Sequence, residues 1–203
     1  PHLGLALAFM RQGRVEDAVR AYQRALTAEP AHLDASIHLG IALVRAGRPQ
    51  QALDALRGAR ARASDDPTLQ LAVARAHASL GQPGESVRHY REALRLRPEL
   101  TLASSELAWI LATSPDPAVR DPDEAIRLAE AALRAEPPRA ASLDALAAAY
   151  AAAGRFDAAV TKAGEAAELA NRDDPALAAA VRARQGLYRA GRPYVAAESG
   201  RLR

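Results

Sequence analysis

Few side chains in this sequence have the type and spacing that chemistry requires. The chain has no cysteine, and Lys162 is its only lysine. Ser104 and Ser105 have no histidine within one helical turn, and the sequence contains neither a Gly-x-Ser-x-Gly motif nor a glycine-rich phosphate loop. The histidines are scattered without metal-ligand spacing: His2, His32, His38, His77 and His89. We therefore expect no catalytic residue, no metal and no other cofactor in this segment.

The composition favours a helical protein outside the membrane. Hydrophobic residues make up 49% of the chain, mostly alanine, and aromatic residues only 4%. No stretch reaches the roughly 18 uninterrupted apolar residues of a membrane-spanning helix, so we expect no membrane contact from this segment. The absence of cysteine excludes disulfides and thiolate metal sites. It leaves both the cytoplasm, which we favour, and the periplasm open.

The charge pattern argues against nucleic-acid binding. The formal net charge is +3, and all but one of the 27 basic residues are arginine. These arginines are spread along the chain and alternate with Asp and Glu, without a basic block. We attribute their number to a bacterial host with GC-rich coding. The expected partner is a protein or a peptide.

A repeat of 34 residues organises the sequence. Leu5, Leu39, Val73 and Leu107 follow one another at this interval, and Leu146 continues the series after a longer gap. Small residues recur in phase with them: Ala18, Ala52, Ser86, Ala125 and Ala159, and then Ala25, Ala59, Ala93, Ala132 and Ala166. Two helices approach closely only where neither carries a bulky side chain, so each repeat is predicted to be a tightly packed antiparallel helix pair.

The helix boundaries follow from prolines and from the spacing of apolar residues. Asp174-Pro175 has the form of an N-cap followed by proline in the first turn, which opens a last helix. That helix carries Arg184 where the repeats have a small residue, so we interpret it as a cap. The predicted pairs are 2–12 with 15–28, 33–46 with 49–62, 67–80 with 83–96, 101–113 with 122–135, and 140–153 with 156–170, followed by the cap at 175–190.

The pattern resembles the tetratricopeptide repeat (TPR), a helix-turn-helix unit of 34 residues. The resemblance implies an all-α fold, a right-handed α-solenoid of stacked antiparallel helix pairs with about five TPR units. It implies one domain over 1–190, with repeats at about 1–32, 33–66, 67–100, 101–139 and 140–173, and a loose tail at 191–203. The first repeat carries the match through Leu5, Ala6, Phe9, Gly13, Ala18, Tyr22, Ala25 and Pro30.

In this family the first helix of each pair lines the concave face of the superhelix. The resemblance therefore implies a scaffold that binds a partner peptide or helix in this groove, with apolar contacts for affinity and arginines for orientation. The implied binding residues are Leu7, Arg11, Ile37, Ile41, Arg45, Leu71, Arg75, Ser105 and Trp109.

Two aromatic positions each allow two interpretations. Trp109, the only tryptophan, is either a binding anchor in the groove or a ring partly buried against the adjacent repeat. His77 occupies the place of a core aromatic residue. It is either a packed histidine with one hydrogen-bonded nitrogen, which we favour, or a pH switch.

The fourth repeat has five extra residues between its helices, in a turn with three prolines at 113–123. A tolerated insertion explains this turn, and partner contact is the alternative. The run Leu107–Thr113 with this turn resembles a variant repeat of bacterial TPR proteins, some of which carry it behind a membrane glycosyltransferase domain. Because the sequence starts at Pro1, within a predicted helix, we expect a fragment of a longer chain. Alternative functions are therefore an accessory domain that positions substrate for such an enzyme, or self-association into a homo-oligomer.

Overall fold

The computed structural model describes residues 2–196, and these residues are helical apart from the connecting turns and the segment 190–196 that follows the last helix. Among them there is no strand, and no helix is both long and apolar enough to cross a membrane. The helices are α1 (His2–Arg11), α2 (Val15–Ala28), α3 (Leu33–Arg45), α4 (Pro49–Arg62), α5 (Pro67–Ser79), α6 (Pro83–Leu96), α7 (Thr101–Thr113), α8 (Pro122–Ala135), α9 (Ala140–Ala152), α10 (Phe156–Asp173) and α11 (Pro175–Arg189). Their bounds lie within three residues of those expected from the sequence.

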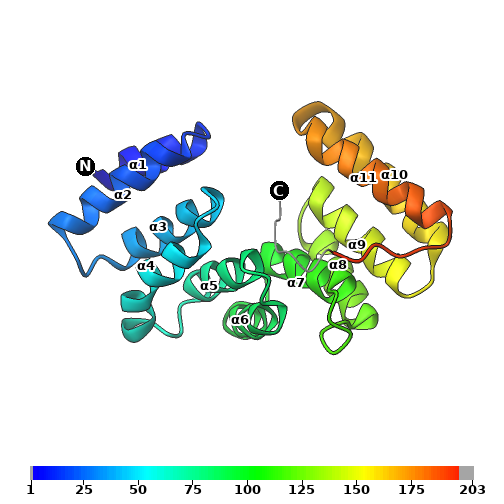
Figure 1. The fold of residues 1–203 in the computed structure, drawn as a ribbon, viewed down its shortest axis with the longest axis horizontal. Coiled ribbons are helices and arrows are strands. Elements are labelled where there is room, and N and C mark those ends of the chain that lie inside the picture. Colours follow the sequence, from blue (N-terminus) through cyan, green and yellow to red (C-terminus); the bar gives the residue numbers. More distant parts are fainter. Residues whose placement is uncertain (1, 197–203) are drawn as a thin grey trace. The chain divides into compact units, whose positions relative to one another are not determined.

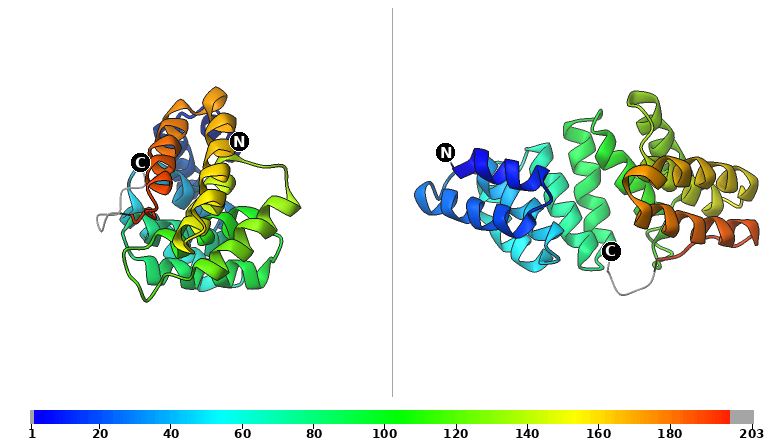
Figure 2. Two further views of the ribbon diagram at one scale, coloured as in Figure 1. Left: turned by 90° about the vertical axis from the view of Figure 1, so that its right-hand side faces the viewer. Right: turned by 90° about the horizontal axis from the view of Figure 1, so that it is seen from above.

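The helices pack as consecutive antiparallel pairs in two compact units (Figures 1 and 2). We call residues 2–96 the N-terminal unit and residues 97–196 the C-terminal unit. In the N-terminal unit α1 packs on α2, α3 on α4 and α5 on α6, and α3 also contacts α2 and α5. In the C-terminal unit α7 packs on α8 and α9 on α10, while α9 contacts α7 and α8, and α11 covers α10. The predicted all-α fold of stacked helix pairs is confirmed.

Three helices begin with an aspartate that caps them and a proline in the first turn. The Asp66 carboxylate accepts hydrogen bonds from the backbone N–H groups of Thr68 and Leu69 at 2.7 and 2.8 Å. Asp121 caps α8 and Asp174 caps α11 in the same way. Each carboxylate satisfies N–H groups that have no partner within the helix, and the missing N–H of proline has no cost there. The helix start predicted at Asp174-Pro175 is therefore observed.

The recurrent small residues lie where the helices of a pair meet. Ala18, Ala52, Ser86, Ala125 and Ala159 are all fully buried. The one hydroxyl among them is satisfied, because Ser86 Oγ donates to the Ala74 carbonyl oxygen at 2.8 Å. Gly40 of α3 faces Leu56 of α4 so closely that a Cβ on Gly40 would lie 2.7 Å from the leucine side chain. The seam within a pair is thus too narrow for larger side chains.

The long turn of the fourth repeat keeps the helix register of the others. In the second repeat the N–H of Arg48, which directly precedes α4, donates to the Leu43 carbonyl oxygen at 2.8 Å. In the fourth repeat the N–H of Asp121, which directly precedes α8, donates to the carbonyl oxygen of Leu111, at the corresponding place in α7, at 3.0 Å. The guanidinium of Arg120 also donates to the Ser114 carbonyl oxygen at 3.0 Å. The extra residues are therefore confined to the turn.

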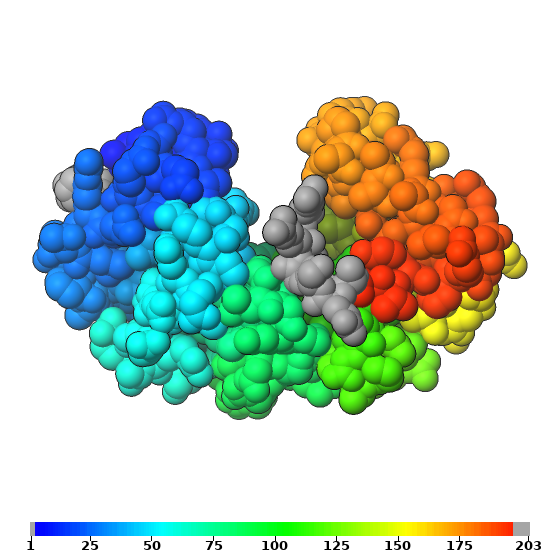
Figure 3. All heavy atoms as spheres, in the orientation of Figure 1, coloured from blue at the N-terminus to red at the C-terminus, as the bar shows by residue number. Residues whose placement is uncertain are grey.

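The segment that follows α11 runs along the C-terminal unit (Figure 3, red). Its Ala196 N–H donates to the carbonyl oxygen of Thr113, the last residue of α7, at 2.8 Å. The ring of Tyr194 packs against Trp109, with 5.8 Å between ring centroids. Residues up to 196 are thus held against α7. The loose tail predicted at 191–203 lies partly outside the described residues, because these end at 196.

Candidate functional site

The first helices of the N-terminal unit carry the exposed part of the predicted binding residues. Arg11 at the end of α1 and Arg45 at the end of α3 are exposed, one repeat apart. Leu7 and Ile41, one helical turn before each arginine, are half-buried. Arg75 of α5 is also half-buried. The structure thus leaves an arginine beside a partly exposed apolar side chain in two successive repeats.

Two predicted binding residues of the same helices are core residues. Ile37 is 2% exposed and belongs to a buried cluster with Leu69 and Val73 of α5. Leu71 is 5% exposed. The side of α3 that carries Ile37 is covered because α3 packs on α5 as well as on α4. Ile37 and Leu71 therefore offer almost no surface to a partner.

The two predicted residues of the C-terminal unit are engaged in contacts of their own. Ser105 of α7 is 6% exposed, and its Oγ lies 2.9 Å from Oγ of Ser142 in α9. The half-buried Trp109 ring is covered by the guanidinium of Arg184, 5.0 Å from the ring centroid, and by Tyr194. The side chains that cover Trp109 come from α11 and the segment behind it.

A buried ion pair lies beneath these aromatic rings. Asp144 of α9 accepts two hydrogen bonds from Arg184 of α11, from Nε at 3.1 Å and from Nη2 at 2.6 Å. The side chains of Asp144 and Arg184 are only 5% and 12% exposed. Burial raises the pKa of Asp144, and the neighbouring Arg184 offsets part of that rise. This cluster joins α7, α9 and α11, and the geometry gives it a structural role.

Tyr188, next to this cluster, offers a simple test of the packing. Its side chain is fully buried, and its hydroxyl has no hydrogen-bond partner among the described residues. Burial, together with the nearby Asp144, raises the pKa of Tyr188. An unsatisfied buried hydroxyl has a desolvation penalty, so we expect Tyr188→Phe to raise the free energy of unfolding by about 1 kcal/mol. Urea unfolding followed by circular dichroism measures this change.

The matched control is Tyr150→Phe. The Tyr150 hydroxyl donates to Glu130 at 2.9 Å, so removing it should lower the free energy of unfolding rather than raise it. A loss of stability in Tyr188→Phe comparable to that in Tyr150→Phe would contradict the absence of a partner for Tyr188.

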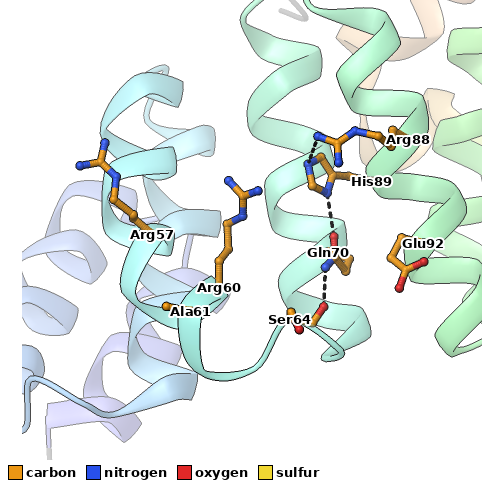
Figure 4. A pocket seen from close by; sticks show the side chains of 8 residues that line it. All are labelled: Arg57, Arg60, Ala61, Ser64, Gln70, Arg88, His89 and Glu92. Carbon is orange, nitrogen blue, oxygen red and sulfur yellow. Dashed lines mark hydrogen bonds between the residues drawn. The ribbon is translucent and has the colours of Figure 1, made fainter.

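A pocket of about 540 Å³ opens in the N-terminal unit beside α4, α5 and α6 (Figure 4). Three arginines surround it. Arg57 pairs with Asp54 at 2.7 Å and Arg88 pairs with Glu85, whereas Arg60 has no ion-pair partner among residues 2–196. The residues that line the pocket are Arg57, Arg60, Ala61, Ser64, Gln70, Arg88, His89 and Glu92.

A chain of hydrogen bonds crosses the wall of this pocket (Figure 4). The Gln70 amide donates to the Ser64 carbonyl oxygen at 2.5 Å, and its own oxygen lies 2.7 Å from His89 Nδ1. Nη2 of Arg88 lies 3.2 Å from His89 Nε2. Since a guanidinium only donates, Nε2 is the acceptor and Nδ1 carries the proton. Burial and the cations Arg88 and Arg60 lower the pKa of His89 to about 4, so the ring is neutral at pH 7.

This pocket was not predicted, because the sequence indicated binding surfaces only on the first helices and at the turn 113–123. The histidines were expected to be scattered without metal-ligand spacing. The structure brings His77 of α5 together with Glu85 and His89 of α6, with one potential ligand atom of each within 4.8 Å of the others. The four-residue spacing of Glu85 and His89 on one predicted helix was the available signal.

Comparisons with known proteins agree with this architecture. Residues 3–67 and 68–100 match family models of the tetratricopeptide repeat. No curated protein sequence matches the chain.

Several solved structures share the fold. A thermophilic TPR protein of Thermus thermophilus superposes with a TM-score of 0.73 at 21% identity, over 93% of this chain and 97% of that one. YrrB, described as a TPR protein with an unusual peptide-binding site, superposes with a TM-score of 0.62 at 20% identity, over 90% and 91% of the two chains. An O-GlcNAc transferase of Thermobaculum terrenum matches with a TM-score of 0.59 at 28% identity, over 66% of this chain and 25% of the enzyme. With its repeated small residues, its antiparallel helix pairs and these matches, the chain is a tetratricopeptide repeat protein.

Proposed function

We propose that this chain is a non-catalytic scaffold that binds an acidic, partly apolar peptide or helix of a partner protein on the first helices of its N-terminal unit. The TPR fold supports protein binding in general. YrrB, with its peptide-binding site, supports a peptide as the ligand. The proposed surface consists of Leu7, Arg11, Ile41 and Arg45.

The proposal rests on two unpaired arginines, Arg11 and Arg45, that each follow a partly exposed apolar side chain by one helical turn. Neither has an ion-pair or hydrogen-bond partner among the described residues. Three neighbouring arginines outside the proposed surface are paired: Arg14 and Arg20 both bind Asp17, and Arg48 binds Glu16 at 2.9 Å. A carboxylate of a partner can therefore bind Arg11 or Arg45 without breaking an existing ion pair. Leu7 and Ile41 would add apolar contact beside each charge.

Charge reversal at these arginines tests the proposal. Peptides selected on the full chain from a random display library should be rich in Asp and Glu beside apolar residues. The double variant Arg11→Glu/Arg45→Glu should weaken their binding about tenfold or more, because two charge-assisted hydrogen-bond donors become repulsive carboxylates. Fluorescence anisotropy with a labelled selected peptide measures the dissociation constant.

The control changes the net charge by the same amount at other sites. Arg24 of α2 and Arg127 of α8 are also exposed, and Arg24→Glu/Arg127→Glu should leave the dissociation constant within about twofold. If both double variants weaken binding equally, the loss of affinity comes from the change in net charge and not from contacts with Arg11 and Arg45. If neither does, the peptide binds elsewhere, and the proposed surface is wrong.

A second function is favoured by one comparison. The match to the Thermobaculum terrenum enzyme covers a quarter of that chain, so a stretch of similar fold occurs within an O-GlcNAc transferase. By analogy, the chain would be an accessory domain that positions substrate for an enzyme in the same polypeptide. The full coding sequence decides this, because it either contains a transferase domain or does not. Self-association stays a third prediction, which light scattering over a concentration series would test.

A further inference from the structure

We propose that His77, Glu85 and His89 form a binding site for a transition-metal dication of the Zn²⁺ type. The site would be independent of peptide binding at Leu7, Arg11, Ile41 and Arg45. It would take two imidazole nitrogens and one carboxylate oxygen from the two helices of the third repeat. One potential ligand atom of each residue already lies within 4.8 Å of the other two. A nitrogen-rich ligand set of this kind selects Zn²⁺, Co²⁺ or Ni²⁺ over Mg²⁺ and Ca²⁺, which prefer oxygen ligands.

Hydrogen bonds orient both imidazole rings as metal-binding histidines require. His77 Nδ1 lies 2.6 Å from the side-chain oxygen of Gln82, and His89 Nδ1 lies 2.7 Å from that of Gln70. An amide oxygen only accepts, so each Nδ1 carries the proton and each Nε2 has a lone pair to offer. Metal-binding histidines commonly donate their second N–H to an oxygen in this way, which fixes the tautomer and raises the basicity of the ligand.

The positively charged guanidinium of Arg88 already contacts two of the three proposed ligands. The Arg88 guanidinium donates to Glu85 through Nη2, and the same Nη2 donates to His89 Nε2 at 3.2 Å. The side chain of Arg88 is 62% exposed, so it can turn into solvent without leaving a cavity. A metal ion would thus exchange with a guanidinium at a place where the protein already holds a cation.

Closure around an ion requires a small movement of the less buried ring. The two histidine rings are parallel within 2°, with centroids 5.5 Å apart, so their lone pairs do not yet converge. Tetrahedral coordination at metal–ligand distances of about 2.0–2.1 Å places the ligand atoms roughly 3.3 Å from one another. His77 is half-buried and Glu85 is exposed, so both side chains can approach the buried His89. Three protein ligands leave the fourth tetrahedral position to water.

Titration of the full chain, without a tag and treated with EDTA, tests the site. Isothermal calorimetry with ZnCl₂ should show binding of one equivalent, and EDTA should reverse it. Co²⁺ should give the visible absorption of a tetrahedral ion. His77→Ala and Glu85→Gln should each weaken Zn²⁺ binding about tenfold or more. Gln82→Ala, which removes only the orienting acceptor, should weaken it about tenfold.

Two further variants distinguish Zn²⁺ binding at this site from Zn²⁺ binding to any surface carboxylate. Glu92→Gln is the matched control for Glu85→Gln, because Glu92 lies on the same helix and pairs with an arginine three residues later, Arg95. It should leave Zn²⁺ affinity unchanged. Arg88→Ala should bind Zn²⁺ more tightly, since the competing cation is gone. Absence of Zn²⁺ binding, or binding that survives both His77→Ala and Glu85→Gln, overturns the proposal. Glu85 is exposed, so its variant decides the question even if His77→Ala does not fold.

Discussion

Replacing Asp144 with alanine is expected to lower the free energy of unfolding of the C-terminal unit by about 3–5 kcal/mol. The substitution removes both acceptors of Arg184 and leaves the guanidinium, whose side chain is only 12% exposed, without a counter-ion. Urea unfolding followed by the fluorescence of Trp109 measures the effect. Trp109 is the only tryptophan, and its ring lies under that guanidinium.

A double replacement separates the cost of an orphaned charge from the value of the pair. Burial raises the pKa of Asp144 in spite of Arg184, which means that desolvation of the carboxylate outweighs the attraction. Asp144→Leu/Arg184→Met should therefore recover most of the lost stability. The exposed pair of Lys162 and Glu165 is the control, and Glu165→Ala should cost less than about 1 kcal/mol. A loss in Asp144→Ala no larger than that in Glu165→Ala would show that Arg184 finds water or another partner.

The second large effect is expected where Gly40 meets Leu56 in the N-terminal unit. Leu56 is fully buried, and Leu56→Ala should lower the free energy of unfolding by about 2–5 kcal/mol, because it leaves a cavity between α3, α4 and α5. Gly40→Ala should cost about 1–3 kcal/mol, since its Cβ would lie 2.7 Å from the leucine side chain. Both values come from urea unfolding followed by circular dichroism.

The two substitutions should compensate each other in part. The methyl group that Gly40→Ala introduces would occupy space that Leu56→Ala vacates, so the double variant should lose less stability than the two single variants together. Gly84→Ala is the matched control within a helix. Apart from its chain neighbours and the backbone of its own helix, nothing lies within 4 Å of a Cβ at Gly84, and the change should raise stability by up to about 1 kcal/mol. Strict additivity in the double variant would show that Gly40 and Leu56 do not share a contact.

The helix pairs could be predicted because each depends on residues close in sequence. The in-phase alanines mark the seam of each pair, and Asp174-Pro175 marks the start of the last helix. The exposure of single residues could not be predicted in the same way. Ile37 is buried by α5 of the next repeat, a contact that the pattern of one repeat does not contain.

The polar clusters depend on partners that the sequence keeps far apart. Arg184 was interpreted as the mark of a capping helix, but its partner Asp144 lies on a different helix, 40 positions earlier. His77 lies near His89 because α5 and α6 are antiparallel, and each ring also needs a particular glutamine. Residue type and helical spacing identify neither glutamine. These sites depend on side-chain geometry, which periodicity does not determine.

The turn between α7 and α8 shows where this scaffold can change in length. The hydrogen bond from the Asp121 N–H to the Leu111 carbonyl oxygen closes this turn in the same way that the bond from Arg48 to Leu43 closes the shorter turn of the second repeat. The register between α7 and α8 therefore does not depend on the number of residues in the turn. Natural variation in this repeat would therefore accumulate as insertions at 115–119. A foreign epitope or a short recognition loop grafted there would be displayed on an unaltered support.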